Sequence, residues 1–319
     1  MAPWNFPIAM ITRKCGAALA ADSVLAQEAG FPTGCINVIT TLNLVAEVGE
    51  TLCTSKLVRK LSFTGRTRVG KLLASQCSSN LTKLSLELGG NSPFIVFDDA
   101  DLETAIEAFT VAKFRNSGQT CVTANRVFVQ SRIYDAFAKA LVDKVKTLKV
   151  GPGTDPDVFI GPLTHERAVE KAMSHVEDAK KRGPQVVLGG APLTDYKGYF
   201  IQPAVIKDMS HDMLMTQEET FALVVGLYKF ETTDEVIALA NDCDVGLGSF
   251  ICTESTPRMW KVAEALDVGM VGVNLGVLSA CESPFGGVKE SGYGREGGRH
   301  GIDEYLTVKP MLINVSAKE

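Results

Sequence analysis

The chain has 319 residues, of which 45% are hydrophobic, so it can bury a substantial core and about two domains are expected. Its 32 basic and 37 acidic residues give a net charge of −5, and no basic stripe is present, which argues against nucleic acid as a partner. The longest apolar runs are far shorter than a membrane span, which argues against a membrane protein.

Cysteine and histidine usage narrows the class further. None of the eight cysteines forms a Cys-x-x-Cys pair and the four histidines are dispersed, so neither a disulfide framework nor a metal site is expected. Scattered free thiols are typical of a reducing compartment. The first seven residues contain neither a charged targeting region nor a cleavage site, which leaves the cytoplasm as the default location.

The hydrophobic pattern predicts alternating helices and strands. In chain order these are a helix at 8–21, strands at 36–40 and 60–64, a helix from 69, strands at 83–88 and 93–97, a helix from about 99, helices at 132–148 and 165–182, a strand at 186–188, a strand at 223–230, helices at 233–241 and 257–266, and a strand at 269–274. Such alternation predicts an α/β architecture with largely parallel sheets.

Four segments are unusually polar or glycine-rich for their setting. They are Pro3–Pro7, Leu84–Asn91, Phe114–Cys121 and Ser283–Gly292. In the second segment, Glu87 lies between two leucines and precedes two glycines. Its carboxylate either lies on the exposed face of a half-buried strand or points into a cleft, where the glycines let a ligand come close.

Cys121 ends the third segment. A lone cysteine is usually a small buried hydrophobe, whereas a catalytic one needs a base or a positive environment that favours the thiolate. No histidine lies nearby in sequence, which argues against a Cys–His hydrolase.

Taken together, the segments resemble the aldehyde dehydrogenase superfamily over essentially the whole chain. Leu86–Asn91 matches the family's glutamate motif, Gly118–Cys121 matches its cysteine motif, and the separation of 34 residues between Glu87 and Cys121 also matches. The resemblance implies a Rossmann-type cofactor domain, here incomplete, and an intact α/β catalytic domain. The division it implies is a partial NAD(P)-binding domain at 1–87, a catalytic domain at 88–298 and a C-terminal segment at 299–319.

The resemblance also implies a mechanism. The Cys121 thiolate would attack the aldehyde carbon, while the Asn5 amide and the Cys121 backbone N–H stabilise the oxyanion. Hydride would pass to NAD or NADP, and Glu87 would activate water to release the acid from the thioester. The alternative for Asn5 is a turn residue before Phe6-Pro7.

For the cofactor, Phe63–Gly70 looks like the family's strand–loop–helix, in which a helix N-terminus faces the pyrophosphate. Arg66 replaces the family's usual small residue there, and it could add a phosphate contact or obstruct the site. Ala222-Leu223 replaces the usual Gly-Pro in the later ribose-binding loop, which leaves the placing of that loop open. The expected cofactor-binding residues are Gly65, Arg66, Gly70, Leu88, Glu219 and Phe221.

Within the family, the chain most resembles the succinate-semialdehyde dehydrogenases. Their substrate carries a second carboxylate, for which the resemblance implies Arg13, Arg115 and Ser279; an arginine fork can pair a carboxylate at two points. Surface ion pairs are the alternative for both arginines. Thr123 stands where the subfamily often has a second cysteine, so no redox switch is expected.

The chain also departs from the family. It lacks the stretch that normally precedes the Pro-Trp-Asn-Phe motif, and Ala18–Ala21 runs directly into Asp22, without the family's valine-rich strand and Lys-Pro motif. Loss of a central parallel strand exposes apolar surface and leaves ladder groups unpaired, so impaired cofactor binding is expected. The last strand, Tyr305–Val315, resembles the family's oligomerisation strand, but the strand that pairs with it within one chain is absent. A homo-oligomer is expected if the chain folds.

The sequence leaves three functions open and argues against a fourth. The first is an active dehydrogenase of reduced cofactor affinity. The second is a non-catalytic remnant, which is either a pseudoenzyme assembling with an intact relative or a gene-model fragment. The third is a thiol hydrolase that uses Cys121, Glu87 and Asn5. The fourth is a P-loop phosphotransferase, which fails because Leu72 stands where a magnesium-ligating hydroxyl is required.

Overall fold

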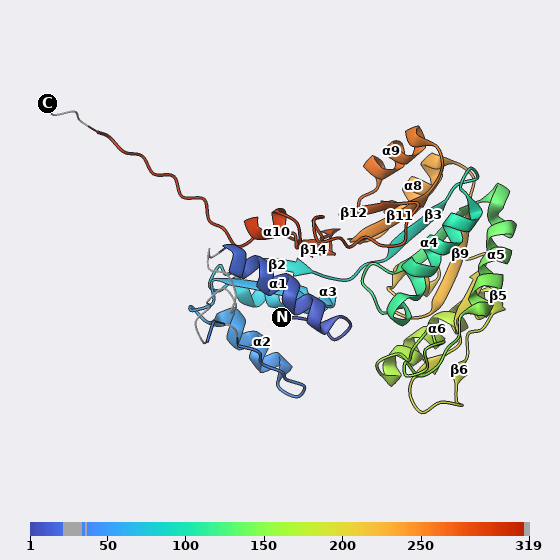
Figure 1. Ribbon diagram of the computed structural model, residues 1–319, viewed down its shortest axis with the longest axis horizontal. Coiled ribbons are helices and arrows are strands. Elements are labelled where there is room, and N and C mark those ends of the chain that lie inside the picture. Colours follow the sequence, from blue (N-terminus) through green and yellow to red (C-terminus); the bar gives the residue numbers. More distant parts are fainter. Residues whose placement is uncertain (22–33, 36, 316–319) are drawn as a thin grey trace.

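The computed structural model describes residues 1–21, 34–35 and 37–315, and within them two sheets lie at opposite ends of the body (Figure 1). The large sheet has seven strands in the order β12-β11-β3-β4-β9-β8-β5, and every neighbouring pair is parallel except β8 and β5. Its strands are β3 (Ser92–Val96), β4 (Ala124–Gln130), β5 (Gln185–Leu188), β8 (Ala204–Lys207), β9 (Val224–Phe230), β11 (Gly248–Cys252) and β12 (Met270–Val273). This arrangement confirms the predicted α/β architecture.

Helices pack around the large sheet, and local sequence explains several of their ends. The helices are α4 (Leu102–Phe114), α5 (Tyr134–Thr147), α6 (Glu166–Arg182), α7 (Leu214–Gln217), α8 (Thr233–Asn241) and α9 (Thr256–Ala265). Asp101 caps α4 by accepting from the Thr104 backbone N–H at 2.8 Å. Thr232 and Glu235 form a capping box on α8, and Gly183 ends α6 in the left-handed conformation. Strands β3, β4 and β9 are almost wholly buried beneath these helices.

The small sheet combines the two ends of the described chain. Its order is β1-β2-β14, with β1 (Lys60–Thr64) and β2 (Lys83–Glu87) parallel and β14 (Gly292–Tyr293) antiparallel to β2. Helix α3 (Thr67–Cys77) connects β1 to β2. A Cβ on Gly70 would lie 2.5 Å from Leu88 Cδ2, so only glycine lets α3 approach this closely. Helices α1 (Pro7–Ala21), α2 (Val45–Thr54) and α10 (His300–Asp303) complete this part.

The remaining described elements are short. They are η2 (Arg115–Gly118), η3 (Ser131–Ile133), β6 (Pro192–Leu193), β7 (Phe200–Ile201), β10 (Val245–Gly246) and β13 (Val288–Lys289). The direct connection from β2 to β3 is only residues 88–91, and a Cβ on Gly90 would lie 2.3 Å from the Cys121 carbonyl oxygen. The chain therefore crosses between the sheets at the loop that carries Cys121.

The predicted strand at 36–40 is wrong. Residues 37–40 have no regular structure, and Val38 and Ile39 are 67% and 75% exposed; residue 36 lies outside the described residues. In the described part of the chain, β1 pairs only with β2, and no strand pairs with 37–40. An alternating apolar sequence needs a neighbouring strand to form a ladder. The predicted discontinuity after Ala21 leads into residues 22–33, which are also outside the described ranges.

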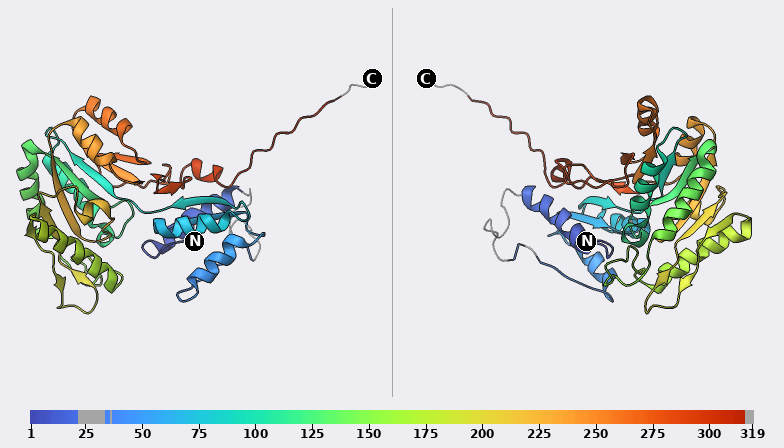
Figure 2. Two further views of the ribbon diagram at one scale, coloured as in Figure 1. Left: turned by 180° about the vertical axis from the view of Figure 1, so that it is seen from behind. Right: turned by 45° about the vertical axis from the view of Figure 1, so that its right-hand side comes forward.

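The predicted strand at Tyr305–Val315 does not form in the single chain either. Residues 307–315 run away from the body as an extended segment (Figures 1 and 2). Val308 and Leu312 are 94% and 98% exposed. This apolar segment has no strand partner among the described residues, and none of the described helices is long and apolar enough to cross a bilayer.

Candidate active site

Cys121 lies on the loop between α4 and β4. Three consecutive residues before it, Asn116, Ser117 and Gly118, have positive φ angles of 51°, 56° and 73°. Left-handed backbone is costly for the two that are not glycine, and such strain persists only where surrounding contacts impose it. One of those contacts is at Gly118, where a Cβ would lie 2.6 Å from the Ala222 carbonyl oxygen.

Hydrogen bonds from the first residues of the chain hold this loop. The Asn5 side-chain amide donates to the Gln119 carbonyl oxygen at 3.0 Å, and the Asn116 amide donates to the Asn5 carbonyl oxygen at 3.1 Å. Gln119 in turn accepts from the Thr164 backbone N–H at 2.9 Å. The Asn5 amide thus lies beside the cysteine loop, with one of its two N–H groups used on Gln119.

Two cavities meet at Cys121. The first, here called the glycine-side cavity, has a volume of about 360 Å³ and is lined by Trp4, Asn5, Gly65, Arg66, Leu88, Gly89, Gly90, Cys121, Lys171, Glu219, Thr220 and Phe221, among others. The second, here called the arginine-side cavity, has a volume of about 90 Å³ and is lined by Phe6, Arg13, Arg115, Cys121, Ser279 and Phe285, among others. Cys121 therefore faces two separate groups of side chains.

The glycine-side cavity contains five of the six residues that the sequence assigned to a cofactor. Gly70 is the exception, because it packs against Leu88 inside the small sheet's core. Phe221 has a positive φ of 57° and meets the Trp4 ring edge-on, with 5.8 Å between ring centroids. The Gly90 backbone N–H donates to the Glu219 carboxylate at 3.4 Å. Burial raises the pKa of Glu219 to about 7.

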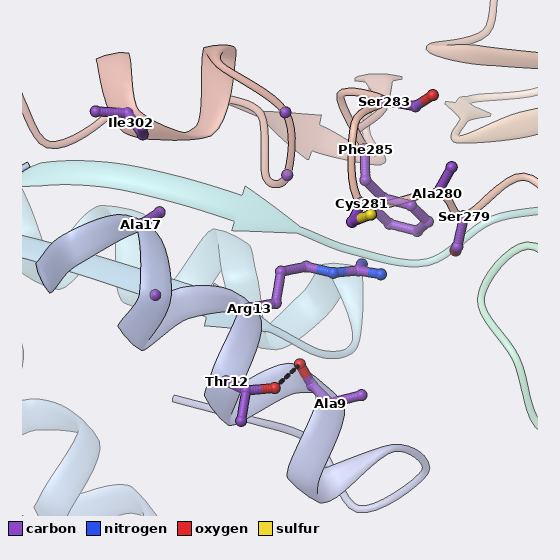
Figure 3. A pocket seen from close by; sticks show the side chains of 13 residues that line it. Ala9, Thr12, Arg13, Ala17, Ser279, Ala280, Cys281, Ser283, Phe285 and Ile302 are labelled. Carbon is purple, nitrogen blue, oxygen red and sulfur yellow. Dashed lines mark hydrogen bonds between the residues drawn. The ribbon is translucent and has the colours of Figure 1, made fainter. Parts of the chain in front are cut away.

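The arginine-side cavity brings together Arg13, Arg115 and Ser279 from three distant segments. The Arg13 guanidinium lies 4.5 Å from the centre of the Phe285 ring, and the Arg115 guanidinium lies 5.4 Å from that of Phe6. A further open cavity of about 520 Å³ shares Arg13, Ser279 and Phe285, and Figure 3 shows Arg13 pointing from α1 toward them. Arg13 Nη1 is buried without a hydrogen-bond partner among the described residues.

Glu87 lines neither cavity, although it is near enough to Cys121 to raise the pKa of the thiol. It ends β2 and is 2% exposed, and neither carboxylate oxygen has a hydrogen-bond partner within the described part of the chain. Burial, and then the nearby Glu296 carboxylate, raise the pKa of Glu87 well above its usual value, although Lys14 opposes them. Glu87 is therefore protonated over part of the pH range in which carboxylates are normally charged.

A buried polar network beside Glu87 was missed by the sequence analysis. Lys14 Nζ donates to the Glu296 carboxylate and to the Thr64 hydroxyl, the latter at 2.6 Å. The side chains of Lys14 and Glu296 are less than one-tenth exposed. Lys14 follows Arg13 in a segment already singled out, and Glu296 follows a glycine-rich one, but no spacing in the sequence connects the two residues.

Cys121 is a protonated thiol in this environment. Its pKa is raised to about 12, chiefly by burial and then by the nearby Glu219 and Glu87 carboxyls, with Arg13 acting in the opposite direction. To act as a nucleophile at neutral pH, the thiol would first have to lose this proton. Within the described residues no group of histidine, cysteine or acidic side chains is arranged to hold a metal ion.

Comparisons with known proteins agree with the fold and the motifs. Residues 23–311 match the "Aldehyde dehydrogenase family". A succinate-semialdehyde dehydrogenase [NADP(+)] of Schizosaccharomyces pombe is 50% identical over 98% of this chain and 66% of its own length. A glutarate-semialdehyde dehydrogenase of Pseudomonas putida is 45% identical over 98% of this chain and 68% of its own. The crystal structure of a succinate-semialdehyde dehydrogenase from Burkholderia pseudomallei, 45% identical, superposes with a TM-score of 0.92 over 96% of this chain and 67% of that one.

This chain is shorter than its relatives. It spans about two thirds of the length of the curated relatives that it matches. The alignment with the fission-yeast protein runs over 330 positions, more than the 319 residues available here. That relative therefore carries residues inside the matched region that have no counterpart in this chain.

Proposed function

Because the chain belongs to the aldehyde dehydrogenase family, we propose that it oxidises succinate semialdehyde, or a similar aldehyde bearing a carboxylate, to the acid with NAD or NADP. The observation that carries the proposal is the position of Cys121 between the two cavities. One cavity presents glycine backbone and Glu219, and the other presents two arginines. A nucleotide and an anionic substrate can therefore reach Cys121 through different cavities.

The glycine-side cavity fits the nicotinamide end of such a cofactor. Its volume falls in the usual range for small-molecule sites, and Gly89 forms part of its wall, where a Cβ would lie 3.3 Å from Thr67 Oγ1 and 3.4 Å from Glu219 Oε2. When bound, the cofactor supplies the hydride acceptor. Gly65, Arg66, Leu88, Glu219 and Phe221 would hold it. We propose that the affinity for this cofactor is lower than in the longer relatives. Residues 37–40 form no strand, so the sheet of the nucleotide-binding part is smaller than the family resemblance implies.

The first covalent step uses Cys121. Its thiol gives up its proton to solvent, and the sulfur forms a bond to the aldehyde carbon while the carbonyl electron pair moves to oxygen. The free N–H of the Asn5 amide and the Cys121 backbone N–H would stabilise that oxyanion. Loss of hydride from the same carbon then leaves a thioester on Cys121.

Glu87 acts in the second step. Its carboxylate would take a proton from water as the water oxygen attacks the thioester carbon, and the acid leaves as Cys121 regains its sulfur lone pair. Because neither cavity is lined by Glu87, the side chain must turn toward Cys121 to do this. Its lack of hydrogen-bond partners among the described residues means that no bond has to be broken for the turn.

Arg13, Arg115 and Ser279 would bind the distant carboxylate of the substrate. Two guanidinium groups in one small cavity repel each other unless an anion lies between them. The names of the fission-yeast and Pseudomonas relatives point to four- and five-carbon semialdehydes, which share this carboxylate. We propose that both lengths enter and that the arginines select for charge.

We also propose a division of the chain into three parts and a route to self-association. The division at residues 87/88 and 298/299 separates a partial nucleotide-binding part, a catalytic part and a C-terminal segment. The exposed apolar side chains at Val308, Leu312 and Val315 support self-association through that segment.

The test is a spectroscopic assay of the purified chain. Succinate semialdehyde is mixed with NAD or NADP, and absorbance of the reduced cofactor is followed beside a Cys121→Ala control. The proposal requires cofactor reduction that is lost in the control. Absence of reduction, together with no cofactor binding on titration, would leave the chain a non-catalytic relative, and ester hydrolysis lost in Cys121→Ala would instead identify a thiol hydrolase.

A further inference from the structure

A buried histidine lies behind the loop that carries Glu219 and Phe221. His175 is on α6 and is 1% exposed, and its Nδ1 lies 3.0 Å from the Thr220 hydroxyl oxygen. Thr220 is 2% exposed and lines the glycine-side cavity together with its neighbours Glu219 and Phe221. None of the steps proposed above uses His175.

The loop 218–222 needs such an anchor because its backbone is strained. Phe221 is a bulky residue with φ of 57°, a conformation held only where neighbouring contacts impose it. The same loop places the Ala222 carbonyl against Gly118, beside the cysteine loop, and the Phe221 ring against Trp4. A shift at Thr220 would therefore move both the Ala222 carbonyl and the Phe221 ring.

The protonation of the ring gives the contact a direction. Burial lowers the pKa of His175 to about 4, so the ring is neutral at pH 7 and one nitrogen carries the proton. Nε2 lies 3.6 Å from the Glu218 carboxylate, which favours the proton on Nε2. Nδ1 then accepts the hydrogen bond that the Thr220 hydroxyl donates.

We propose that His175 is a positioning residue: by accepting from Thr220 through Nδ1, it fixes Glu219 and Phe221 at the wall of the glycine-side cavity. The consequence for nucleotide binding rests on the proposed function, whereas the effect on the loop does not. Only Nδ1 makes this hydrogen bond. A positioning role therefore depends on which ring nitrogen is kept, whereas general packing does not.

Two amide substitutions test which nitrogen matters. His175→Asn keeps a polar atom near Nδ1, whereas His175→Gln places its amide near Nε2, toward Glu218. Thr220→Val removes the hydroxyl at nearly constant volume. In a Trp260→Phe background Trp4 is the sole tryptophan, and its contact with Phe221 makes its fluorescence a report on the loop.

We expect His175→Asn to retain the parent emission and NADP dissociation constant. His175→Gln and Thr220→Val should each shift emission to the red and raise the dissociation constant by about threefold to tenfold, the usual effect of one hydrogen bond. The double variant His175→Gln/Thr220→Val should have the same emission and the same dissociation constant as the more affected single variant, because both changes remove the same contact. Thermal unfolding followed by far-ultraviolet circular dichroism identifies any variant that fails to fold. If a His175 variant fails to fold, Thr220→Val is compared with the parent instead, because it removes the same hydrogen bond.

Equal emission for the Asn and Gln variants, or parent-like emission for Thr220→Val, would overturn the inference. If NADP binds the parent, equal dissociation constants across the variants would overturn it as well. If NADP does not bind the parent, the proposed function is contradicted at its cofactor step. The emission of the three variants then still decides the role of His175.

Discussion

The side-chain amide of Asn5 donates to the carbonyl oxygen of Gln119 at 3.0 Å, across 114 residues of sequence. This bond connects the start of the described chain to the loop of the nucleophile. One amide N–H fixes the loop, and the other is free to meet an oxyanion that forms at Cys121.

Asn5→Ala should lower the rate of thioester formation by about 100-fold, because it removes an oxyanion donor and a loop anchor together. The measurement is the single-turnover rate with succinate semialdehyde, compared with the rate of Cys121 alkylation by iodoacetamide, which forms no oxyanion. The oxyanion role predicts a much larger loss in the first rate than in the second. Equal losses would assign Asn5 to loop structure alone.

Glu87→Gln should stop turnover after thioester formation, because an amide cannot take the proton from water. In the parent, the hydrolytic rate should rise with pH above the usual carboxyl range, since the pKa of Glu87 is raised by burial and by Glu296. Mass spectrometry of the quenched variant should find the acyl group on Cys121. An unmodified chain that still releases acid would exclude Glu87 as the base.

The same pKa shift predicts a change in stability. Because the folded pKa of Glu87 exceeds the unfolded one, its contribution to stability is fully present below the unfolded pKa and is lost as pH rises through the folded pKa. Glu87→Gln should therefore narrow the difference in unfolding temperature between pH 5 and pH 8. A difference as large as that of the parent would contradict the assignment.

Arg13→Met and Arg115→Met should each raise KM for succinate semialdehyde by about tenfold or more, the usual value of a charged hydrogen bond. Butanal, which has the same carbon count and lacks the carboxylate, is the matched substrate, and its KM should change little. A parallel loss with both aldehydes would mean that the arginines hold the fold and not the substrate.

Gly90→Ala should reduce Cys121 reactivity by about 100-fold, because the new Cβ would lie 2.3 Å from the Cys121 carbonyl oxygen and displace the nucleophile. Gly153→Ala is the control, since a Cβ there meets nothing within 4 Å. The rate of thiol alkylation measures both without any cofactor. A reactive Gly90→Ala protein would show that the loop can move aside at little cost.

Arg66→Ser should weaken NADP binding by roughly tenfold, because Arg66 lines the glycine-side cavity and has no carboxylate partner within the described residues. Arg68→Ser, on the same exposed end of α3 but outside the cavity lining, should leave binding unchanged. Tighter binding by Arg66→Ser would show instead that the arginine obstructs the cofactor.

Local pattern predicted four of the seven strands of the large sheet, namely β3, β5, β9 and β12, and missed β4, β8 and β11. Strand β4 has the buried polar pair Asn125 and Arg126 near its start, which interrupts its apolar run, and β8 has only four residues. The opposite error occurred at 36–40, where the alternation is strand-like but no described strand pairs with it. Whether a strand forms depends on its neighbour, which local sequence does not encode.

The candidate site was predictable only in part. The motifs around Glu87 and Cys121 identified the segments, and the structure brings Arg13, Arg115 and Ser279 into one cavity with Cys121. The ion pair between Lys14 and Glu296, and the contact between His175 and Thr220, join residues that are far apart in sequence. Contacts of that kind arise from tertiary packing, so no spacing rule could find them.

The short connection at residues 88–91 determines which atoms move least if the two sheets rotate relative to each other. The connection from β2 to β3 passes against the carbonyl of Cys121, so the nucleophile lies next to a direct covalent link between the small and large sheets. In a rotation of one sheet relative to the other about this link, the atoms near it are displaced least, so Cys121 is the part of the candidate site that such a rotation disturbs least.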